Sequence, residues 1–306
     1  MNRILVGLGV AVVILALILP ALAIPYVISL GLFVAMYTAL AQSWNLISGF
    51  TGYVSFGHVA FFGTGAYTAA ILIGQHDWHW IPAALTGGIT AVLLGVVIGI
   101  PCLRLKGPYF AIAMLGLSQV LRIVALLWDS LTQGGSGIYL PPAKDITPFY
   151  YGMVGVALFS SGTVALVARS PFGLRLLAIR EDEMAAEAMG INAPRHKILA
   201  FLLSAFPSGV VGGIYAPYVA FLEPLSTFAT LITIQMIVMT MLGGRATAAG
   251  PVIGAIFLTL TGELVWARFP FLHQALFGVL ILAIVLFMPN GIVGMLRDRG
   301  WLPAQT

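Results

Sequence analysis

The sequence predicts an all-α, polytopic helical membrane protein with about ten transmembrane helices. Of its 306 residues, 60% are hydrophobic and only 8% are charged, whereas soluble domains carry roughly 25% charged residues. The apolar runs are continuous and do not alternate with polar positions, as they would in the strands of a membrane β-barrel. Because a backbone in lipid must satisfy its own hydrogen bonds, these runs are expected to be helices.

The apolar runs divide into ten segments. A full membrane span needs roughly 20 residues. The expected segments are 4–24, 27–48, 58–74, 81–102, 108–128, 150–168, 198–222, 230–243, 250–268 and 271–289. Pro82, Pro108, Pro251 and Pro289 lie near segment ends, where a missing N–H costs least. The segment 58–74 is short, and if it is a half-helix the count falls to nine or eight.

The N-terminus resembles a secretory signal peptide. A basic start at Met1-Asn2-Arg3 precedes an apolar run and the small residues Ala21-Leu22-Ala23, which is the order of such a signal. The alternative is a retained first helix, which we favour. The chain enters the membrane in either case, because apolar segments continue to the C-terminus.

The basic residues predict an orientation with both termini inside the cell. Cytoplasmic loops carry an excess of Lys and Arg, and their placement matters more than the net charge. In this orientation 11 of the 14 Lys and Arg residues lie inside. They are Arg3, Arg104, Lys106, Arg169, Arg175, Arg180, Arg195, Lys197, Arg245, Arg297 and Arg299. Lys144 and Arg268 fall outside, and Arg122 lies in or near a helix end.

We expect one transmembrane domain, 1–306, with one strongly charged cytoplasmic loop, 169–197. This loop holds nine charged residues in 29 positions. Its apolar residues Leu177, Met184, Ala188 and Ile191 recur at spacings of 7, 4 and 3. That spacing predicts one apolar stripe on a short amphipathic helix.

Glycine and proline limit this expected helix. Pro171 and Gly173 break the chain before it, Gly190 is placed to stop it, and Pro194 prevents its continuation. The helix is either a solvated connector with incidental amphipathicity or a docking element for a cytoplasmic partner. In the second case its stripe fills a groove and its charges fix the orientation. The candidate docking residues are Arg180, Glu181, Asp182, Glu183, Met184, Ala185, Ala186, Glu187, Ala188 and Gly190.

The loop resembles the cytoplasmic coupling loop of ABC importer permeases, and specifically of the branched-chain amino acid (LivM-type) permeases. Matching pieces extend over nearly the whole chain. They are Gly52-Tyr53-Val54-Ser55-Phe56-Gly57-His58, Lys106-Gly107-Pro108-Tyr109-Phe110-Ala111, Ser170-Pro171-Phe172-Gly173, Ala178-Ile179-Arg180-Glu181-Asp182-Glu183, Ala185-Ala186-Glu187-Ala188-Met189-Gly190-Ile191-Asn192 with Lys197, and Gly250-Pro251-Val252-Ile253-Gly254-Ala255. One departure is Gly243-Gly244-Arg245-Ala246, where Gly-Gly-x-Gly is expected. It leaves the conformation of that turn open.

The resemblance implies a pore-forming subunit in a bacterial inner membrane. Its implied partners are a second homologous permease subunit, two cytoplasmic ATP-binding subunits and a periplasmic amino-acid-binding protein. ATP and Mg would bind to the partner subunits, and no cofactor to this chain. Independently, the sequence lacks G-x-x-x-x-G-K-[ST] and contains no Gly-Lys pair, so it encodes no phosphate cradle of that type.

Polar residues in apolar segments are candidates for the translocation pathway, because ionisable groups in a bilayer are costly. The candidates are Asn45, Gly52, Ser55, Gly57, His58 and Glu263. The 52–58 turn is preferred, since discontinuous helices present backbone dipoles to small charged solutes. Glu263 serves the pathway or an interhelix contact, or else pairs with Arg268 or water. His58 has no His or Cys companions for a metal site, so a packed, hydrogen-bonded histidine is expected.

Lone amides and small residues in the apolar segments also have two interpretations. Gln42, Gln119 and Gln235 bond to neighbouring helices or line a path for a zwitterion, and the first is favoured. Gly65 and Gly209 are expected to allow close helix approach.

Two other functions are weaker. An ion-coupled secondary transporter of small polar solutes needs intramembrane carboxylates, and Glu263 is the one clear candidate. A membrane-embedded enzyme needs a nucleophile and a base, for which Ser55 with His58 is the nearest approach. The lone Cys102 shows no disulfide or metal pattern, and no basic stripe indicates nucleic-acid binding.

Overall fold

The computed structural model describes residues 14–22 and 24–268 and the single positions 278, 279, 282, 291 and 294. Six helices in this part are long and apolar enough to cross a membrane. The protein is therefore an all-α, polytopic membrane protein, as predicted. The expected segments 4–24 and 271–289 lie mostly outside the described residues. The total of ten helices and the orientation in the membrane stay predictions.

The helices agree with the expected segments to within a few residues, apart from the charged loop. The main helices are α2 (Pro25–Trp44), α3 (Val59–His76), α4 (Trp80–Cys102), α5 (Pro108–Leu127), α7 (Thr147–Arg169), α8 (Pro171–Glu181), α9 (Glu183–Ala188), α10 (Ala193–Val219), α12 (Thr230–Gly243) and α13 (Ala249–Arg268). The short elements are η1 (Leu19–Leu22), η2 (Asn45–Gly49), α6 (Asp129–Thr132), η3 (Gly134–Ser136), β1 (Ile138–Tyr139), β2 (Phe221–Leu222) and α11 (Pro224–Thr227). Proline occupies the first turn of α2, α5, α7, α8 and α10, where its missing N–H breaks no helical hydrogen bond.

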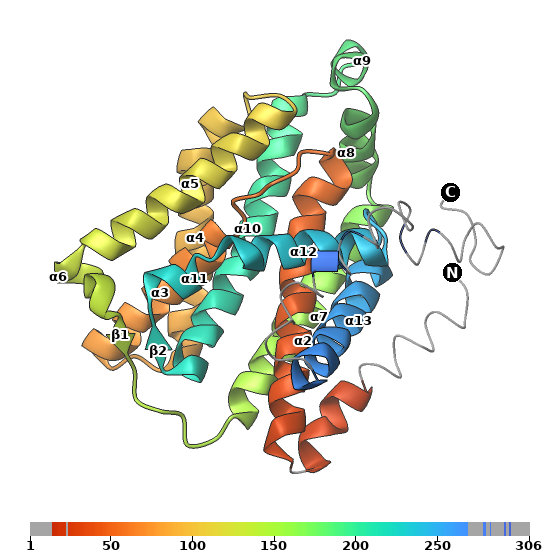
Figure 1. Ribbon diagram of the computed structural model, residues 1–306. Helices are drawn as coiled ribbons and strands as arrows, with labels where there is room; N and C mark the ends of the chain where they lie inside the picture. Colours follow the sequence, from red (N-terminus) through yellow and green to blue (C-terminus); the bar gives the residue numbers. More distant parts are fainter. Residues whose placement is uncertain are drawn as a thin grey trace.

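The centre of the bundle is α10, which packs against α3 and α4 on one side and against α2 and α7 on the other (Figure 1). Small residues make this packing close. A Cβ atom built on Gly65 of α3 would lie 2.0 Å from the carbonyl oxygen of Gly209 in α10. Two backbones can approach so closely only where neither side chain intervenes, so the expected role of these glycines in helix packing is confirmed.

Helix α3 follows a break in the chain. The α2 helix continues into a π-helical turn, η2, and the backbone then leaves the helix over residues 52–55 before α3 begins at Val59. Helix α3 has 18 residues, close to the 17 expected, and it is not among the six candidate spans because it is less apolar than they are. Its first half is almost entirely buried, so α3 belongs to the protein interior.

The two ends of the bundle differ. One end, called the α9 end below, carries α8, α9, the 52–58 turn and the α4–α5 connection (Figure 1). The opposite end carries α6 and the short antiparallel pair β1–β2. Residues Arg104, Lys106, Arg169, Arg175, Arg180, Arg195 and Lys197, all predicted to be cytoplasmic, belong to the α9 end.

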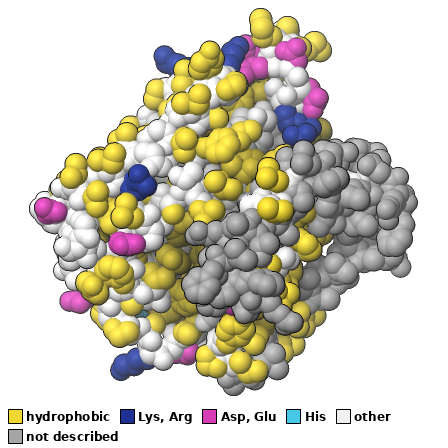
Figure 2. All heavy atoms as spheres, viewed as in Figure 1, with side chains coloured by type: hydrophobic (Ala, Val, Ile, Leu, Met, Phe, Trp, Pro, Cys, Tyr) yellow, Lys and Arg dark blue, Asp and Glu magenta, His cyan; other side chains and the backbone are white. Residues whose placement is uncertain are grey.

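The surface between the ends is largely apolar. Large hydrophobic side chains are exposed along α4, α5 and α7, including those of Val97, Ile112 and Leu166. In Figure 2, hydrophobic side chains cover much of the visible face, and charged ones gather most densely at its top, over α8 and α9. This distribution is expected of a surface that faces lipid over most of its height.

Candidate functional site: helices α8 and α9 and the broken helix beneath them

The charged loop 169–197 forms two helices and not the single amphipathic helix predicted. Asp182 interrupts it with an extended backbone, φ −156° and ψ 112°. Its side-chain oxygen accepts hydrogen bonds from the N–H groups of Met184 and Ala185, at 2.9 and 3.0 Å. Asp182 is therefore the N-cap of α9, a role that Asp fills well. Pro171, expected to break the chain, instead begins α8, and Gly173 lies inside it.

The predicted apolar stripe divides between two surroundings: Leu177 and Ile191 are partly buried against the protein, whereas Met184 and Ala188 are exposed. The buried residues of the two helices are Leu176, Ile179 and Ala186, and the last two pack together with Ala193. Met184, expected in the stripe, is 73% exposed. The stripe assumed one continuous helix, and the cap at Asp182 changes the direction of the chain between its two halves.

The outer face of α9 is apolar and unusually exposed. Met189, just beyond the helix, is 85% exposed, and Ala185 and Ala188 are exposed as well. Helix α9 projects beyond the rest of the bundle (Figure 1). An exposed cluster of flexible methionines at the tip of a projecting element suits contact with another protein.

The end of the loop carries two signals, Gly190 and Pro194. Gly190 adopts φ +85°, with hydrogen bonds from its own N–H to Glu187 and from the Ile191 N–H to Ala186. These two bonds define a Schellman motif, which glycine favours. Helix α9 ends at Ala188, before Pro194, and Pro194 lies in the first turn of the next helix, α10.

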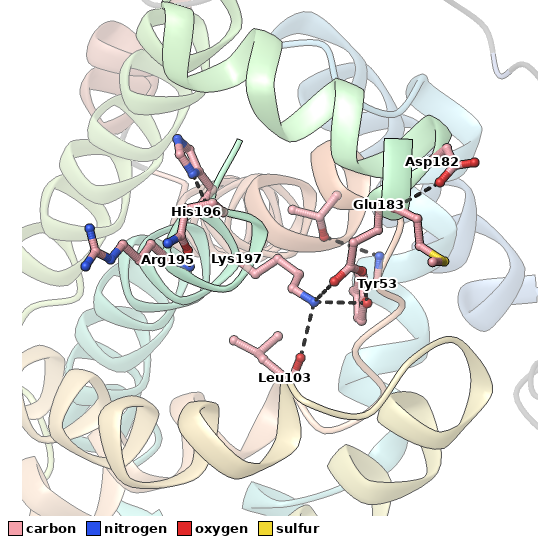
Figure 3. A network of polar contacts seen from close by, with 10 residues as sticks. Tyr53, Leu103, Asp182, Glu183, Arg195, His196 and Lys197 are labelled. Atoms are coloured by element: carbon pink, nitrogen blue, oxygen red, sulfur yellow. Dashed lines mark hydrogen bonds and ion pairs between the residues drawn. The ribbon is translucent and has the colours of Figure 1, made fainter. Parts of the chain in front are cut away.

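A buried ion pair joins α9 to the bundle. The Lys197 ammonium of α10 lies 2.7 Å from a carboxylate oxygen of Glu183, and the two side chains are 2% and 14% exposed. The same nitrogen donates hydrogen bonds to the Tyr53 hydroxyl at 3.0 Å and to the Leu103 carbonyl at 3.2 Å. The Tyr53 hydroxyl in turn donates to the other carboxylate oxygen of Glu183. Figure 3 shows these groups converging.

The protonation states of this network follow from its contacts. Burial alone raises the pKa of Glu183, but the hydrogen bonds from Lys197 and Tyr53 and the charge of Lys197 bring it below its usual value. Burial, and then the hydrogen bond to Glu183, raise the pKa of the Tyr53 hydroxyl. The carboxylate is therefore ionised at neutral pH while Tyr53 keeps the proton that it donates.

A second contact links α8 to the broken helix. The Arg180 guanidinium donates a hydrogen bond to the Gly49 carbonyl at 3.2 Å and pairs with Glu181 at 3.0 Å. Its aliphatic stem covers Gly52, because a Cβ on Gly52 would lie 2.9 Å from the Arg180 Cγ. Gly52 also has φ +76°, so glycine is favoured there on both grounds.

The 52–58 turn holds two buried polar side chains. Ser55 and His58 are fully buried; among the described residues the Ser55 hydroxyl makes no hydrogen bond, and the His58 ring has only the backbone of Ser204 as a partner. His58 packs edge-on against Phe61, with ring centroids 5.2 Å apart. The expected packing is confirmed, and the backbone of Ser204 is the hydrogen-bond partner of the ring. The two residues also do not form the nucleophile–base hydrogen bond that an enzyme would need.

Asn45 and Gly57 have structural roles in this conformation. The Asn45 side chain accepts a hydrogen bond from the Ala246 N–H at 2.8 Å and donates one to the Thr247 carbonyl at 3.0 Å. It thereby holds the turn after α12. A Cβ on Gly57 would lie 1.9 Å from the Met114 carbonyl oxygen, so this glycine permits contact with α5.

Glu263 lies apart from the other pathway candidates. Its carboxylate accepts a hydrogen bond of 2.7 Å from the hydroxyl of Tyr26, which makes it an interhelix contact between α13 and α2. The three glutamine amides form hydrogen bonds with other segments, which is the interpretation favoured from the sequence. The pairs are Gln42 with Ala248 and Ser161, Gln119 with Thr230, and Gln235 with Tyr37.

The sequence motifs contained Tyr53 and Lys197, but nothing in them assigned either residue to a site. Lys197 was counted as one of many cytoplasmic basic residues. The signal in the sequence is the position of Lys197 directly before an apolar run. A lysine that is buried there needs a partner for its charge.

Known proteins resemble the chain over most of its length. The sequence profile of a family described as "Branched-chain amino acid transport system / permease component" matches residues 26–288. The branched-chain amino acid permease LivM of Escherichia coli K12 is 28% identical over 93% of this chain and 75% of its own length. The permease LivH of Salmonella typhimurium is 24% identical over 84% and 91%. The autoinducer 2 import permease LsrC of Escherichia coli O9:H4 is 27% identical over 71% and 67%. No solved structure matches significantly.

Proposed function

Because the chain belongs to the permease-component family of branched-chain amino acid transport systems, we propose that it forms half of the translocation pathway of an ABC importer in a bacterial inner membrane. The other half is a second, homologous permease subunit. Two cytoplasmic subunits bind and hydrolyse ATP with Mg, and a periplasmic binding protein delivers the solute. The chain itself carries out no chemistry and binds no cofactor.

One observation carries the proposed coupling to ATP. Helix α9 projects from the bundle with Met184 and Met189 exposed at 73% and 85%, and its inner face is anchored to α10 through Glu183 and Lys197. An apolar tip on an anchored base is suited to a groove on a partner that moves. Closure of the ATP-binding subunits would displace α8 and α9 and thereby bias the bundle between inward-open and outward-open states.

The proposed solute is a branched-chain amino acid. The relatives LivM and LivH are named for that transport and LsrC for autoinducer 2, and the match to LivM covers more of this chain. The companion periplasmic protein should therefore bind leucine, isoleucine or valine. Calorimetric titration of that protein with these amino acids and with autoinducer 2 tests the assignment, which fails if autoinducer 2 alone binds.

Removal of the apolar tip tests the docking role. We expect Met184→Asp with Ala188→Asp to abolish co-purification of the ATP-binding subunits from detergent-solubilised membranes, because a buried carboxylate in an apolar groove is costly. Tyr139→Asp is the matched control, since Tyr139 is also 73% exposed but lies at the opposite end, and it should retain the subunits. Retention of the subunits by the double variant would contradict the docking role.

A further inference from the structure

The Lys197 ammonium is a junction of four chain segments. It belongs to α10 and contacts Glu183 of α9, Tyr53 of the 52–58 turn and the carbonyl of Leu103 at the end of α4. Each of its three hydrogens thus has an acceptor. The ammonium also lies 4.4 Å from the centroid of the Tyr53 ring, within the range of a cation–π contact.

Stability alone is a poor reason for this arrangement. Taking an ammonium and a carboxylate out of water is costly, and apolar side chains of similar volume often stabilise a protein as well or better. A buried pair does, however, fix the relative position of the segments that carry it, because moving either partner leaves the other charge unpaired. Here the segments are the proposed docking helix and the turn that begins α3.

We infer that Tyr53, Glu183 and Lys197 are positioning residues that hold α9 and the 52–58 turn together as one mechanical unit. A displacement of α9 would then carry the turn, with Ser55 and His58, and the start of α3. This inference rests on the proposed function, in which the ATP-binding subunits displace α9.

The Arg180 contact supports the same unit from a second point. Arg180 of α8 holds the Gly49 carbonyl and covers Gly52, only one residue before Tyr53. Two separate contacts fix the orientation of a segment as well as its distance, which a single contact does not. The end of η2 and the beginning of the turn are therefore tied to both α8 and α9.

Loss of the unit should uncouple ATP hydrolysis from transport. In the reconstituted complex, Lys197→Met should lower solute uptake about tenfold, while the ATP-binding subunits remain bound and basal ATP hydrolysis continues. Arg195→Met is the matched control, because Arg195 is an exposed cation in the same helix turn that points away from Glu183 (Figure 3). It should transport normally.

Two further variants keep the test decisive. Tyr53→Phe removes one hydroxyl and leaves the ion pair, so it should give the same uncoupling if Lys197→Met does not fold. In a Cys102→Ser background, the pair Tyr53→Cys with Glu183→Cys should be uncoupled, and a short bifunctional thiol reagent that joins the two cysteines should restore uptake. Before it is joined, the double variant should still bind its ATP-binding subunits and hydrolyse ATP, which a chain that had merely lost stability would not do.

The outcomes separate this inference from the proposed function. If the wild-type chain co-purifies with ATP-binding subunits but Lys197→Met and Tyr53→Phe transport normally, the unit is refuted and the function stands. The inferred unit is also refuted if the variants lose uptake only when they lose the bound subunits. Inhibition of uptake by the tether would refute it as well. If the wild-type chain binds no such subunits, the proposed function itself fails.

Discussion

The hydroxyl of Tyr53 donates a hydrogen bond to the carboxylate of Glu183 across 130 positions of the chain. Tyr53 lies in the turn that separates the broken helix α2–η2 from α3, and Glu183 is the first residue of α9. The two regions singled out from the sequence, a candidate pathway turn and a candidate docking loop, are thus in direct contact.

Acid should weaken the attachment of α9. The pKa of Glu183 lies below its ordinary value of 4.5, so the folded state favours the ionised form. Its contribution to stability is present above about pH 4.5 and is lost as the pH falls through the folded pKa. The groups facing Glu183 are Lys197, Tyr53, Lys106 and, through Tyr53, Glu187.

The matching substitution is Glu183→Gln, which leaves the Lys197 charge buried without a counter-ion. We expect the free energy of unfolding to fall by about 2–3 kcal/mol. The loss is smaller than for a buried charge without any partner, because Tyr53 and Leu103 still accept hydrogen bonds from Lys197. Thermal unfolding in detergent at several pH values measures it. Glu181→Gln is the control, since Glu181 is 75% exposed. An acid transition equally large in wild type and Glu183→Gln would rule out Glu183 as its source.

Substitution of Ala246 should stabilise the turn after α12. Ala246 has φ +57°, a left-handed conformation that costs a residue with a Cβ roughly 1–2 kcal/mol. Ala246→Gly should therefore raise the free energy of unfolding by about 0.5–1 kcal/mol, once the greater flexibility of glycine in the unfolded chain is counted. Ala248→Gly is the control, because Ala248 has no positive φ, and it should destabilise. A loss of stability in Ala246→Gly would show that burial of the Ala246 methyl group outweighs the backbone strain.

Enlargement of Gly65 should disrupt the contact between α3 and α10. The new Cβ would meet the Gly209 carbonyl oxygen at 2.0 Å, and a backbone atom cannot rotate away. We expect Gly65→Ala to lower the free energy of unfolding by about 3 kcal/mol or more. It should also reduce the monodisperse fraction in size-exclusion chromatography. Gly155→Ala in α7 meets nothing within 4 Å, so it should be neutral or stabilising. Normal folding of Gly65→Ala would contradict the observed helix spacing.

Ser55 and His58 should become accessible only during transport. Both are fully buried in the described conformation, and among the described residues the Ser55 hydroxyl lacks a hydrogen-bond partner. If they line the pathway, Ser55→Cys and His58→Cys in a Cys102→Ser background should react with a small thiol reagent during ATP turnover and not at rest. Leu40→Cys, from a fully buried site in α2, should stay unreactive. Equal protection in both states would exclude them from the pathway.

The sequence anticipated the features that depend on short stretches of chain. Low charge and continuous apolar runs identify lipid as the solvent, because the bilayer penalises every exposed polar group. The stop at Gly190 follows from the conformational freedom of glycine, and the short α3 from the length of its apolar run. The same local reasoning was wrong for α8 and α9, because Asp182 can cap a helix as readily as lie within one.

Ala246 is an intermediate case. In the sequence, Ala246 stands in a motif where glycine is expected. In the structure, Ala246 has φ +57°. The sequence could not decide whether the turn would change or the alanine would take the strained conformation. The Asn45 side chain, which accepts a hydrogen bond from the Ala246 N–H, stabilises the second outcome from 201 positions away.

By itself, the sequence determined that this chain is a helical membrane protein of the permease family, where its long apolar helices lie and which loop is charged. Only the tertiary structure decided that Lys197 is buried against Glu183, that Tyr53 joins them and that Arg180 covers Gly52. Hydropathy reports how much each helix avoids water, but not which helices are neighbours or how they are rotated. Side chains more than 100 residues apart meet through packing, which no local pattern encodes.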